Sequence, residues 1–574
     1  MLLRVPSFRH LVSAVTLITL TPVLGHAANQ QHTHGSSQRP ALLENFDAIG
    51  AWFEDVAAIN GTSIARRPNV TIAIVGAGIS GLTTGLMLDS IGVHNWEIIE
   101  ASDRIGGRFR TKYVGGTQEW AEMGPMRLPY SIKYRSDNTT HEYTDHRMTF
   151  QLAEWLNKLN KNDTKWKVDF IPWLQHHPNE LLARGTGRHA DGRIPTRGEI
   201  AANPELAAPP PMSSAEYNNT KSAMNGILKN ETRLREIQRD IWRAHEKAME
   251  ENLDDWSEQG MMRHLFKASE NVTDAIATDT DYEVFWDEMV HNSNLAQDGG
   301  RGAFGETEWK CVDGGFNRLS DAFTPHVQDR VVFNRKIRKL ESVGDGKGGL
   351  RTRLSWYPSA TNRTYESKEY DYTVMTLPFT MTRLMDLPKF SSTLSRAIGE
   401  HGLRFQISLQ GGAAVQGTVL GEGRAAHLWR LLSACERGHG GAYRGGDWSD
   451  RFVSLPDEEY VGMVLDAIVS LHGEEARRLY TGDYEKLCWL QDEHSATSWC
   501  RPNVEQHRLY IPSYHRTEHN TIFIGEHTAP THAWISSSLH SAVRGSVQLL
   551  LELGMVDEAK KLNKEWMGRW INRT

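Results

Sequence analysis

Short apolar runs and helical patterns alternate along the chain. Residues 71–75 (TIAIV) form an apolar run suited to a buried parallel strand, residues 82–90 follow a helical pattern, and residues 96–99 (WEII) form a second run. A strand, a helix and a strand within about 30 residues predict a β-α-β unit. Later runs predict strands over 331–333, 350–357, 372–377 and 521–524, and a long terminal helix from about Ser536. These elements predict an α/β fold.

The middle of the chain has a different pattern. Residues 145–300 are rich in Trp, Lys, Glu and His, and a proline-containing loop lies near residues 204–211. Between 222 and 268, apolar residues such as Ile227, Leu234 and Ile241 recur at helical spacing. We expect a largely helical insertion that covers a substrate cleft.

Size and charge narrow the class of protein. A chain of 574 residues is too long for one ordinary core, so two or three packed domains are expected. The formal net charge of −7 argues against a nucleic-acid binder, which would carry a basic excess. Histidines and cysteines show no metal-ligand spacing, so we expect no metal site and assign no histidine base. The four cysteines permit zero to two disulfides and include no C-x-x-C pair: Cys311, Cys435, Cys488 and Cys500.

The N-terminus has the pattern of a signal peptide over residues 1–27. Arg4 and Arg9 lie in a basic region, residues 11–24 are apolar, and Ala27 is a small residue of the kind that precedes a cleavage site. The apolar run is short for a bilayer span, so we expect a secreted protein with no membrane association after cleavage. N-x-S/T triplets corroborate secretion and begin at Asn60, Asn138, Asn162, Asn218, Asn230, Asn271, Asn362 and Asn572. Another, at Asn69, abuts the first strand and is expected to stay unmodified.

A glycine-rich turn lies between the first predicted strand and helix. Gly76-x-Gly78-x-x-Gly81 offers a tight turn, a close approach for a pyrophosphate, and close packing of helix on strand. Ile79 and Ser80 lie at the helix N-terminus, whose free N–H groups favour phosphate. Glu100 ends the second strand, where a carboxylate can bind a ribose diol. The arrangement predicts a dinucleotide site.

The next segment narrows the dinucleotide to FAD. Residues 100–108 (EASDRIGGR) resemble the second fingerprint of the flavin amine oxidases, which dehydrogenases that use nicotinamide do not carry. The resemblance implies that Glu100 and Ala101 lie at the cofactor and that Arg108 contacts the pyrophosphate. A surface arginine is the alternative for Arg108.

Residues 122–129 (EMGPMRLP) resemble the L-amino-acid oxidases within that family. The resemblance implies that Gly124, Pro125, Met126 and Arg127 lie along the flavin and that Arg127 binds the substrate carboxylate. Chemistry supports this independently, because a planar guanidinium presents two parallel donors to a carboxylate. Monoamine and polyamine substrates have no carboxylate to bind. An internal salt bridge is the alternative for Arg127.

The C-terminal region is similar to the part of the family that completes the site. In residues 525–529 (GEHTA) the resemblance implies that Glu526 holds the ribityl chain. In residues 533–538 (AWISSS) it places the helix N-terminus at the flavin and Trp534 in an aromatic wall beside the substrate. The corresponding cofactor residues are Ala533, Trp534, Ile535, Ser536, Ser537 and Ser538, with Ala533 standing where the family usually has Gly. Weaker matches place Ile337 near the adenine and Trp499, with Trp489, near the substrate side chain.

The resemblance covers about residues 41–406 and 446–570, and it implies a two-domain, Rossmann-like flavoprotein of the amine-oxidase type with a mixed-sheet substrate domain. The expected organisation is a signal peptide (1–27), an FAD-binding domain in three parts (41–145, 301–345 and 501–574), a mainly helical cleft region (146–300) and a substrate-binding domain (346–500). A homodimer is one assembly compatible with the resemblance.

The resemblance also implies the reaction. Arg127 holds the carboxylate of an L-amino acid, the Cα hydrogen leaves as hydride to the flavin, and the imino acid hydrolyses to a 2-oxo acid and ammonia. Dioxygen then reoxidises the flavin and gives hydrogen peroxide. A monoamine or polyamine oxidase is the alternative enzyme, and an inactive flavin-binding protein is the alternative from another class.

Residues 407–446 depart from the family pattern. They are rich in Gly, Arg and Ala and show no strand periodicity, where the family has strands with an active-site Lys and a substrate-binding Tyr. We hypothesise a reading-frame error. With permissible codons, the nucleotides for residues 411–433 (GGAAVQGTVLGEGRAAHLWRLLS) can be read in another frame as KVALQFKGPFWEKGERPIYGGCS, which has the missing alternation and lysine.

Sequencing the spliced transcript across this segment tests the hypothesis. We expect a shifted frame over residues 411–433, because the shifted reading restores strand alternation. An uninterrupted literal frame would defeat the idea and would favour the inactive flavin-binding alternative.

Overall fold

The computed structural model describes residues 65–113, 120–174, 177–181, 187–207, 210–276, 304–400, 409–415 and 454–566, the segment 409–415 by its backbone. All of them belong to one compact unit, residues 42–574. The predicted signal peptide, residues 41–64, residues 277–303 and most of the segment 407–446 lie outside the described residues.

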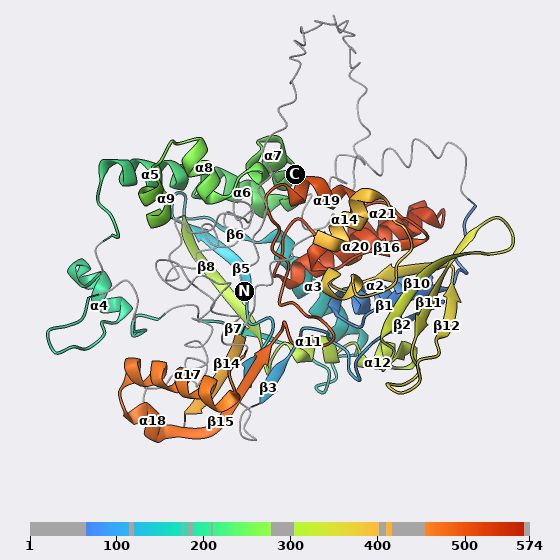
Figure 1. The fold of residues 1–574 in the computed structure, drawn as a ribbon, viewed down its shortest axis with the longest axis horizontal. Coiled ribbons are helices and arrows are strands. Elements are labelled where there is room, and N and C mark those ends of the chain that lie inside the picture. The colour runs from blue at the N-terminus through green and yellow to red at the C-terminus, as the bar shows by residue number, and fades with distance from the viewer. Residues whose placement is uncertain are drawn as a thin grey trace, which may run out of the picture. The chain divides into compact units, whose positions relative to one another are not determined.

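A parallel sheet assembles from segments far apart in the sequence (Figure 1). Its strand order is β16-β13-β1-β2-β9, and the four pairings between neighbours are all parallel. The strands are β1 (Ile72–Val75), β2 (Trp96–Ile99), β9 (Val331–Val332), β13 (Tyr372–Met375) and β16 (Thr521–Phe523). Strands β1 and β13 are buried at every position, as continuous apolar runs inside a covered parallel sheet should be.

Helix α2 (Ile79–Ser90) connects β1 to β2 and packs against α20 (Ile535–Glu552). The predicted β-α-β unit is therefore confirmed, but the helix begins at Ile79 rather than at residue 82. The sequence pattern missed this first turn because Ser80 and Gly81 are not apolar, yet both are buried. The Ser80 hydroxyl donates to the Ser538 carbonyl at 3.2 Å, so the first turns of α2 and α20 touch.

Antiparallel sheets make up the rest of the described strands. A four-stranded sheet has the order β6-β5-β8-β7, and smaller sheets are β10-β11-β12, β3-β4 and β14-β15. Their bounds are β3 (Thr111–Tyr113), β4 (Trp120–Glu122), β5 (Leu128–Tyr134), β6 (Thr140–Glu142), β7 (Phe170–Pro172), β8 (Gly305–Val312), β10 (Ile337–Gly344), β11 (Leu350–Trp356), β12 (Glu366–Tyr370), β14 (Leu409–Val415) and β15 (Tyr480–Cys488). β8 shares a sheet with β5, and β13 lies within the parallel sheet. The expected domain boundaries stay predictions.

The described middle of the chain is mainly helical over residues 144–159 and 197–276, whereas its described residues between 160 and 196 form loops and the short strand β7. The helices are α3 (Thr144–Leu159), α4 (Arg197–Ala202), α5 (Ala215–Leu228), α6 (Glu231–Arg239), α7 (Ile241–Glu250), α8 (Glu258–His264) and α9 (Glu270–Ile276). The remaining helices include α11 (Asn317–Asp321), α12 (Thr324–Val327), α13 (Phe379–Thr382), α14 (Ser392–Glu400), α17 (Asp457–His472), α18 (Glu475–Leu479), α19 (Gln506–Tyr514) and α21 (Val556–Glu565). Of the apolar residues predicted at helical spacing, Leu234 and Ile241 are buried and Ile227 is half-buried, but they lie in three successive helices, α6, α7 and α5 respectively.

The segment 407–446 requires one correction. Residues 409–415 form β14, which pairs antiparallel with β15, although the sequence showed no strand periodicity there. Backbone hydrogen bonding to a partner strand does not need alternating side chains, and the partner β15 supplies it. The reading-frame hypothesis stays a prediction.

Arg544 in α20 ties this helix to the parallel sheet. It is 1 % exposed, and its guanidinium donates to the carbonyls of Phe523 at 2.6 Å and Tyr514 at 2.8 Å and to the Thr528 hydroxyl at 3.0 Å. Burial lowers the pKa of Arg544 to about 9. This cation fixes the start of the loop that leads from β16 to the N-terminus of α20.

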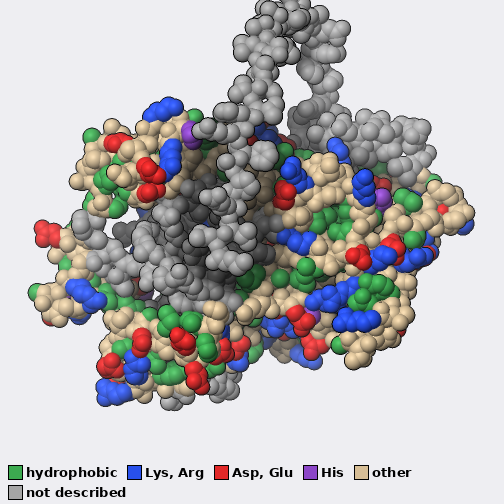
Figure 2. Space-filling model, in the orientation of Figure 1, with side chains coloured by type: hydrophobic (Ala, Val, Ile, Leu, Met, Phe, Trp, Pro, Cys, Tyr) green, Lys and Arg blue, Asp and Glu red, His purple; other side chains and the backbone are tan. Residues whose placement is uncertain are grey.

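The surface carries both signs of charge. Over the β10-β11-β12 sheet, cationic and anionic side chains lie next to one another (Figure 2), as in the pairs of Glu369 with Arg351 and Arg353. Within the described residues, no helix has the length and apolarity needed to cross a bilayer.

Candidate active site

The glycine-rich turn after β1 forms the first wall of the site. Gly76 has a φ of +110°, and its N–H donates to the Ile99 carbonyl at 2.9 Å. A Cβ atom at position 81 would lie 2.1 Å from the Gly76 carbonyl oxygen, so α2 can approach the turn only with glycine there. A Cβ atom at Gly78 would meet nothing within 4 Å. The turn therefore leaves open space in front of the first residues of α2, Ile79 and Ser80.

Glu100 follows β2 and connects the turn to the second fingerprint. Its Oε2 accepts from the Ala77 N–H at 2.7 Å, and its Oε1 accepts from the Ser102 N–H at 2.8 Å. Its own N–H donates to the Val332 carbonyl at 2.9 Å, so the segment before β10 runs beside it. A shallow hollow beside Ile99 is lined by Ala101 and Ile337, among other residues. The structure thus brings together these two predicted cofactor residues from distant parts of the sequence.

The half-buried Arg108 and the buried Glu526 form an ion pair. Nη1 of Arg108 lies 3.1 Å from Oε1 of Glu526 and donates at 2.6 Å to the Ser498 carbonyl. Glu526 also accepts from the N–H groups of Cys500 at 2.8 Å and Ala533 at 3.3 Å. Burial alone would raise the pKa of Glu526, but hydrogen bonding to His532 and the Arg108 charge outweigh it and hold the pKa well below its ordinary value. The carboxylate is ionised and joins three segments.

Two stacked imidazoles extend from this carboxylate. Nδ1 of His532 lies 3.1 Å from the Glu526 carbonyl oxygen, and Nε2 of His532 lies 3.0 Å from Nε2 of His507. Since a carbonyl only accepts, Nδ1 of His532 carries a proton, and in the neutral ring Nε2 accepts from His507. Both rings are buried. The pair therefore restrains the backbone on which Glu526 is held.

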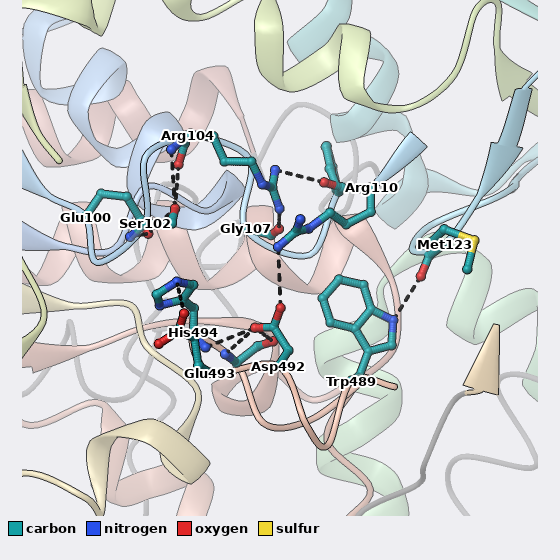
Figure 3. Close-up of polar contacts among 12 residues, drawn as sticks. Glu100, Ser102, Arg104, Gly107, Arg110, Met123, Trp489, Asp492, Glu493 and His494 are labelled. Atoms are coloured by element: carbon teal, nitrogen blue, oxygen red, sulfur yellow. Dashed lines mark hydrogen bonds and ion pairs between the residues drawn. The ribbon is translucent and has the colours of Figure 1, made fainter. Parts of the chain in front are cut away.

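The loop after Trp489 lies against the second fingerprint (Figure 3). Asp492 accepts from Arg110 at 3.4 Å, and the Trp489 indole N–H donates to the Met123 carbonyl at 2.9 Å. Trp489 thus packs beneath the predicted flavin-contacting loop. The predicted substrate residue Trp499 is half-buried and immediately precedes Cys500, whose N–H binds Glu526. This places Trp499 beside the Arg108–Glu526 pair.

The loop that carries Gly124, Pro125, Met126 and Arg127 joins β4 to β5. A Cβ atom at position 124 would lie 2.1 Å from the Arg108 carbonyl oxygen, so this glycine is needed for backbone packing. Glu122, at the end of β4, accepts from the Phe316 N–H at 2.7 Å and the Thr111 hydroxyl at 3.0 Å. Burial raises the pKa of Glu122 to about 8, which keeps most of this carboxyl group uncharged at neutral pH.

Arg127 lies in an aromatic setting. Its Cζ is 5.1 Å from the ring centroid of Trp309, and Trp309 stacks on Trp534 at 6.3 Å with an interplanar angle of 26°. His146 meets Trp534 edge to face at 4.9 Å. Burial lowers the pKa of His146 to about 3, so among these four side chains Arg127 alone is charged at neutral pH. The structure therefore brings the predicted residues Arg127 and Trp534, which are 407 positions apart in the sequence, into contact with the same side chain, the indole of Trp309.

Trp309 and His146 were not among the predicted site residues. Trp309 lies on β8, where burial alternates along residues 305–309, and this period of two in the sequence GETEW would have identified an inward-facing tryptophan. His146 follows no spacing that signals chemistry, and only the packing of α3 against α20 brings it to Trp534.

Ala533 and the residues after it form the entrance to α20. Ala533 has a φ of +65°, which an L-residue with a Cβ adopts at a cost. Ile535, Ser536, Ser537 and Ser538 form the first turn of α20 and are buried. The Ser537 hydroxyl pairs with Thr531 at 2.9 Å, whereas the Ser536 hydroxyl has no hydrogen-bond partner among the described residues.

The profile of the flavin containing amine oxidoreductases matches residues 79–550. The chain is 35 % identical to an L-amino-acid oxidase of Neurospora crassa, over 91 % of this chain and 78 % of that one. It is 25 % identical to an L-amino-acid oxidase of Siganus canaliculatus, over 84 % of this chain and 86 % of that one.

Solved structures share the fold. A redesigned putrescine oxidase superposes with a TM-score of 0.54 at 15 % identity, and covers 84 % of this chain and 98 % of its own. Cyclohexylamine oxidase of Brevibacterium oxydans superposes with a TM-score of 0.51 at 14 % identity. The match covers 86 % of this chain and 100 % of that one.

The fold and the nucleotide-binding turn define an FAD-dependent oxidoreductase. The chain belongs to the flavin-containing amine oxidoreductase family, and FAD is its cofactor. Two features fit this cofactor: the open space in front of Gly78 suits a pyrophosphate, and the buried, unpartnered Ser536 hydroxyl lies at a helix N-terminus.

We predict that Ala533→Gly stabilises the protein by up to about 1 kcal/mol, because it removes the left-handed strain of a residue with a Cβ. The midpoint of urea unfolding of the flavin-loaded protein measures this. Ala529→Gly is the matched control in the same loop: its φ of −97° suits alanine, so glycine there should destabilise. Equal destabilisation by both substitutions would contradict the prediction.

Proposed function

We propose that this flavoprotein is an L-amino-acid oxidase. It converts an L-amino acid, dioxygen and water into a 2-oxo acid, ammonia and hydrogen peroxide. The observation that carries the proposal is the guanidinium of Arg127 on the face of Trp309, with Trp534 on the same indole at the start of α20. The relatives named L-amino-acid oxidase support the same substrate class.

Arg127 supplies the recognition that separates amino acids from simple amines. Its planar guanidinium binds a carboxylate through two parallel hydrogen bonds, which fixes both the position and the orientation of the substrate. Trp534 borders the substrate as part of an aromatic wall, and the neutral His146 adds no competing charge. Holding the Cα–H bond in one orientation lowers the barrier to its cleavage.

The cofactor is held by the residues of the two fingerprints and of the α20 entrance. When bound, FAD accepts the hydride from Cα and passes electrons to dioxygen. Glu100 binds the ribose hydroxyls, and the N-terminus of α2, with Ile79 and Ser80, faces the pyrophosphate. Arg108 contributes positive charge there, and Glu526 holds the ribityl chain.

The remaining contacts with the cofactor come from the backbone of two loops and from the dipole of α20. The Gly124–Arg127 loop and residues 533–538 border the flavin, and the partial positive charge at the N-terminus of α20 stabilises negative charge on it. Ala101 and Ile337 line the shallow hollow beside Ile99, and we assign both residues to the adenosine half of the cofactor. Trp499 contributes to the wall on the substrate side.

Secretion and glycosylation belong to the same proposal. The signal-peptide pattern of residues 1–27 supports export, and the described sequon residues Asn138, Asn162, Asn218, Asn271 and Asn362 are exposed, as acceptors must be. Asn230 is a poorer acceptor because its side chain caps α6 by accepting from the Arg233 N–H. We propose a homodimer as the assembly.

Two other functions are separated by one substrate panel. A monoamine or polyamine oxidase would oxidise amines that lack a carboxylate, and an inactive flavoprotein would bind FAD but oxidise neither class. We expect peroxide from L-amino acids in a panel of amino acids and matched amines, with protein made from a verified transcript. Peroxide from the amines alone, or from neither class, would overturn the proposal.

We predict that Arg127→Met lowers kcat/KM for L-amino acids by about 30-fold or more, because a carboxylate that loses its charged partner costs about 2–5 kcal/mol. FAD content should be retained. Lys133→Met, which removes an exposed positive charge from β5, the strand that follows Arg127, is the matched control and should leave kcat/KM within about twofold. Unchanged turnover in Arg127→Met would refute the assigned role of the guanidinium.

A further inference from the structure

We infer that Trp309 is a positioning residue for Arg127 and thereby sets the affinity of the site for a carboxylate. This inference rests on the proposed function, because it concerns the same carboxylate site. The juxtaposition of the Arg127 guanidinium, the Trp309 ring and the Trp534 ring supports it.

The strand pairing determines where the indole lies. Pro129 on β5 is the register partner of Trp309 on β8, so Trp309 lies opposite a residue only two positions after Arg127. The register shifts between Pro129 and Ser131, an irregularity that increases local strand twist at this point. Arg127 immediately precedes β5, and its guanidinium therefore reaches the face of the Trp309 indole.

The indole itself cannot move easily. Trp309 is 3 % exposed and belongs to a buried cluster with Ile132, Tyr134, Tyr143 and Leu234. Trp534 covers it with nearly parallel rings, and Trp534 in turn precedes the first residue of α20. A fixed aromatic face gives the long Arg127 side chain one preferred position, which reduces the entropy lost when a carboxylate binds.

The attraction between guanidinium and ring is large enough to measure. A cation on an indole face contributes about 0.5–2 kcal/mol, most when the pair is removed from water. At 1.4 kcal/mol per factor of ten, losing the ring should weaken carboxylate binding by about 2- to 30-fold. Because the ring touches Arg127, the effect should fall on substrate binding more than on the rate of the chemical step.

The indole N–H gives a second observation. Nε1 of Trp309 is buried and has no hydrogen-bond partner among the described residues. A buried donor without a partner is unfavourable, so an acceptor that enters the site is favoured. A carboxylate beside Arg127 carries lone pairs that can serve this role.

The test compares Trp309→Leu and Trp309→Phe in the FAD-loaded protein. Benzoate, a carboxylate without an amine, is titrated while the flavin absorbance is recorded, and KM and kcat are measured with the best L-amino acid of the panel. We expect Trp309→Leu to raise the benzoate Kd and KM by about 2- to 30-fold with kcat within about threefold. Trp309→Phe keeps an aromatic face and should fall between Trp309→Leu and the unsubstituted protein.

The control is Phe304→Leu, which removes an aromatic ring packed against the same cluster and should leave the benzoate Kd unchanged. An unchanged Kd in Trp309→Leu, or an equal rise in Phe304→Leu, overturns the inference while leaving the oxidase activity in place. If the unsubstituted protein binds benzoate but oxidises no amino acid, the proposed function fails, and a raised Kd in Trp309→Leu still supports the inference. If it binds no benzoate at all, the carboxylate site itself is refuted, and this inference with it.

Discussion

The site depends on the buried carboxylate of Glu526. It pairs with Arg108 of the second fingerprint and binds the N–H groups of Cys500 and Ala533. Removing an ion pair from water is costly, and the additional hydrogen bonds offset this cost. Through these contacts one side chain connects the second fingerprint to the entrance to α20.

The substrate side follows from that arrangement. Ala533 leads directly to Trp534, whose indole stacks on Trp309, and Trp309 supports the guanidinium of Arg127. The left-handed backbone at Ala533 turns the chain into α20 at the required angle. In the proposed function, recognition of the substrate acid group and binding of the cofactor are thus connected by contiguous contacts rather than by proximity in the sequence.

Local patterns predicted those parts of the fold that depend on local residues. The strands at 72–75 and 96–99 and the glycine turn follow from apolar runs and from backbone geometry that only glycine allows. The resemblance of the 122–129 motif predicted Arg127 and, from the C-terminal region, Trp534. In the structure, the side chains of Arg127 and Trp534 both lie against the indole of Trp309.

What the sequence did not predict depends on tertiary contacts. Trp309 reaches Arg127 only through the register of β5 and β8, and His532 restrains Glu526 only because His507 stacks on it. Residues 409–415 form a strand despite their two glycines because β15 pairs with them. No local pattern encodes such pairings.

A crystal structure of the FAD-loaded protein with a bound L-amino acid or carboxylate analogue tests the central claim most directly. We predict two N–H···O bonds of about 2.7–2.9 Å from the edge of the Arg127 guanidinium to the ligand carboxylate, with the Trp309 ring still against one face of the guanidinium. A carboxylate bound by another residue, with Arg127 turned toward an acidic side chain of the protein, would contradict it.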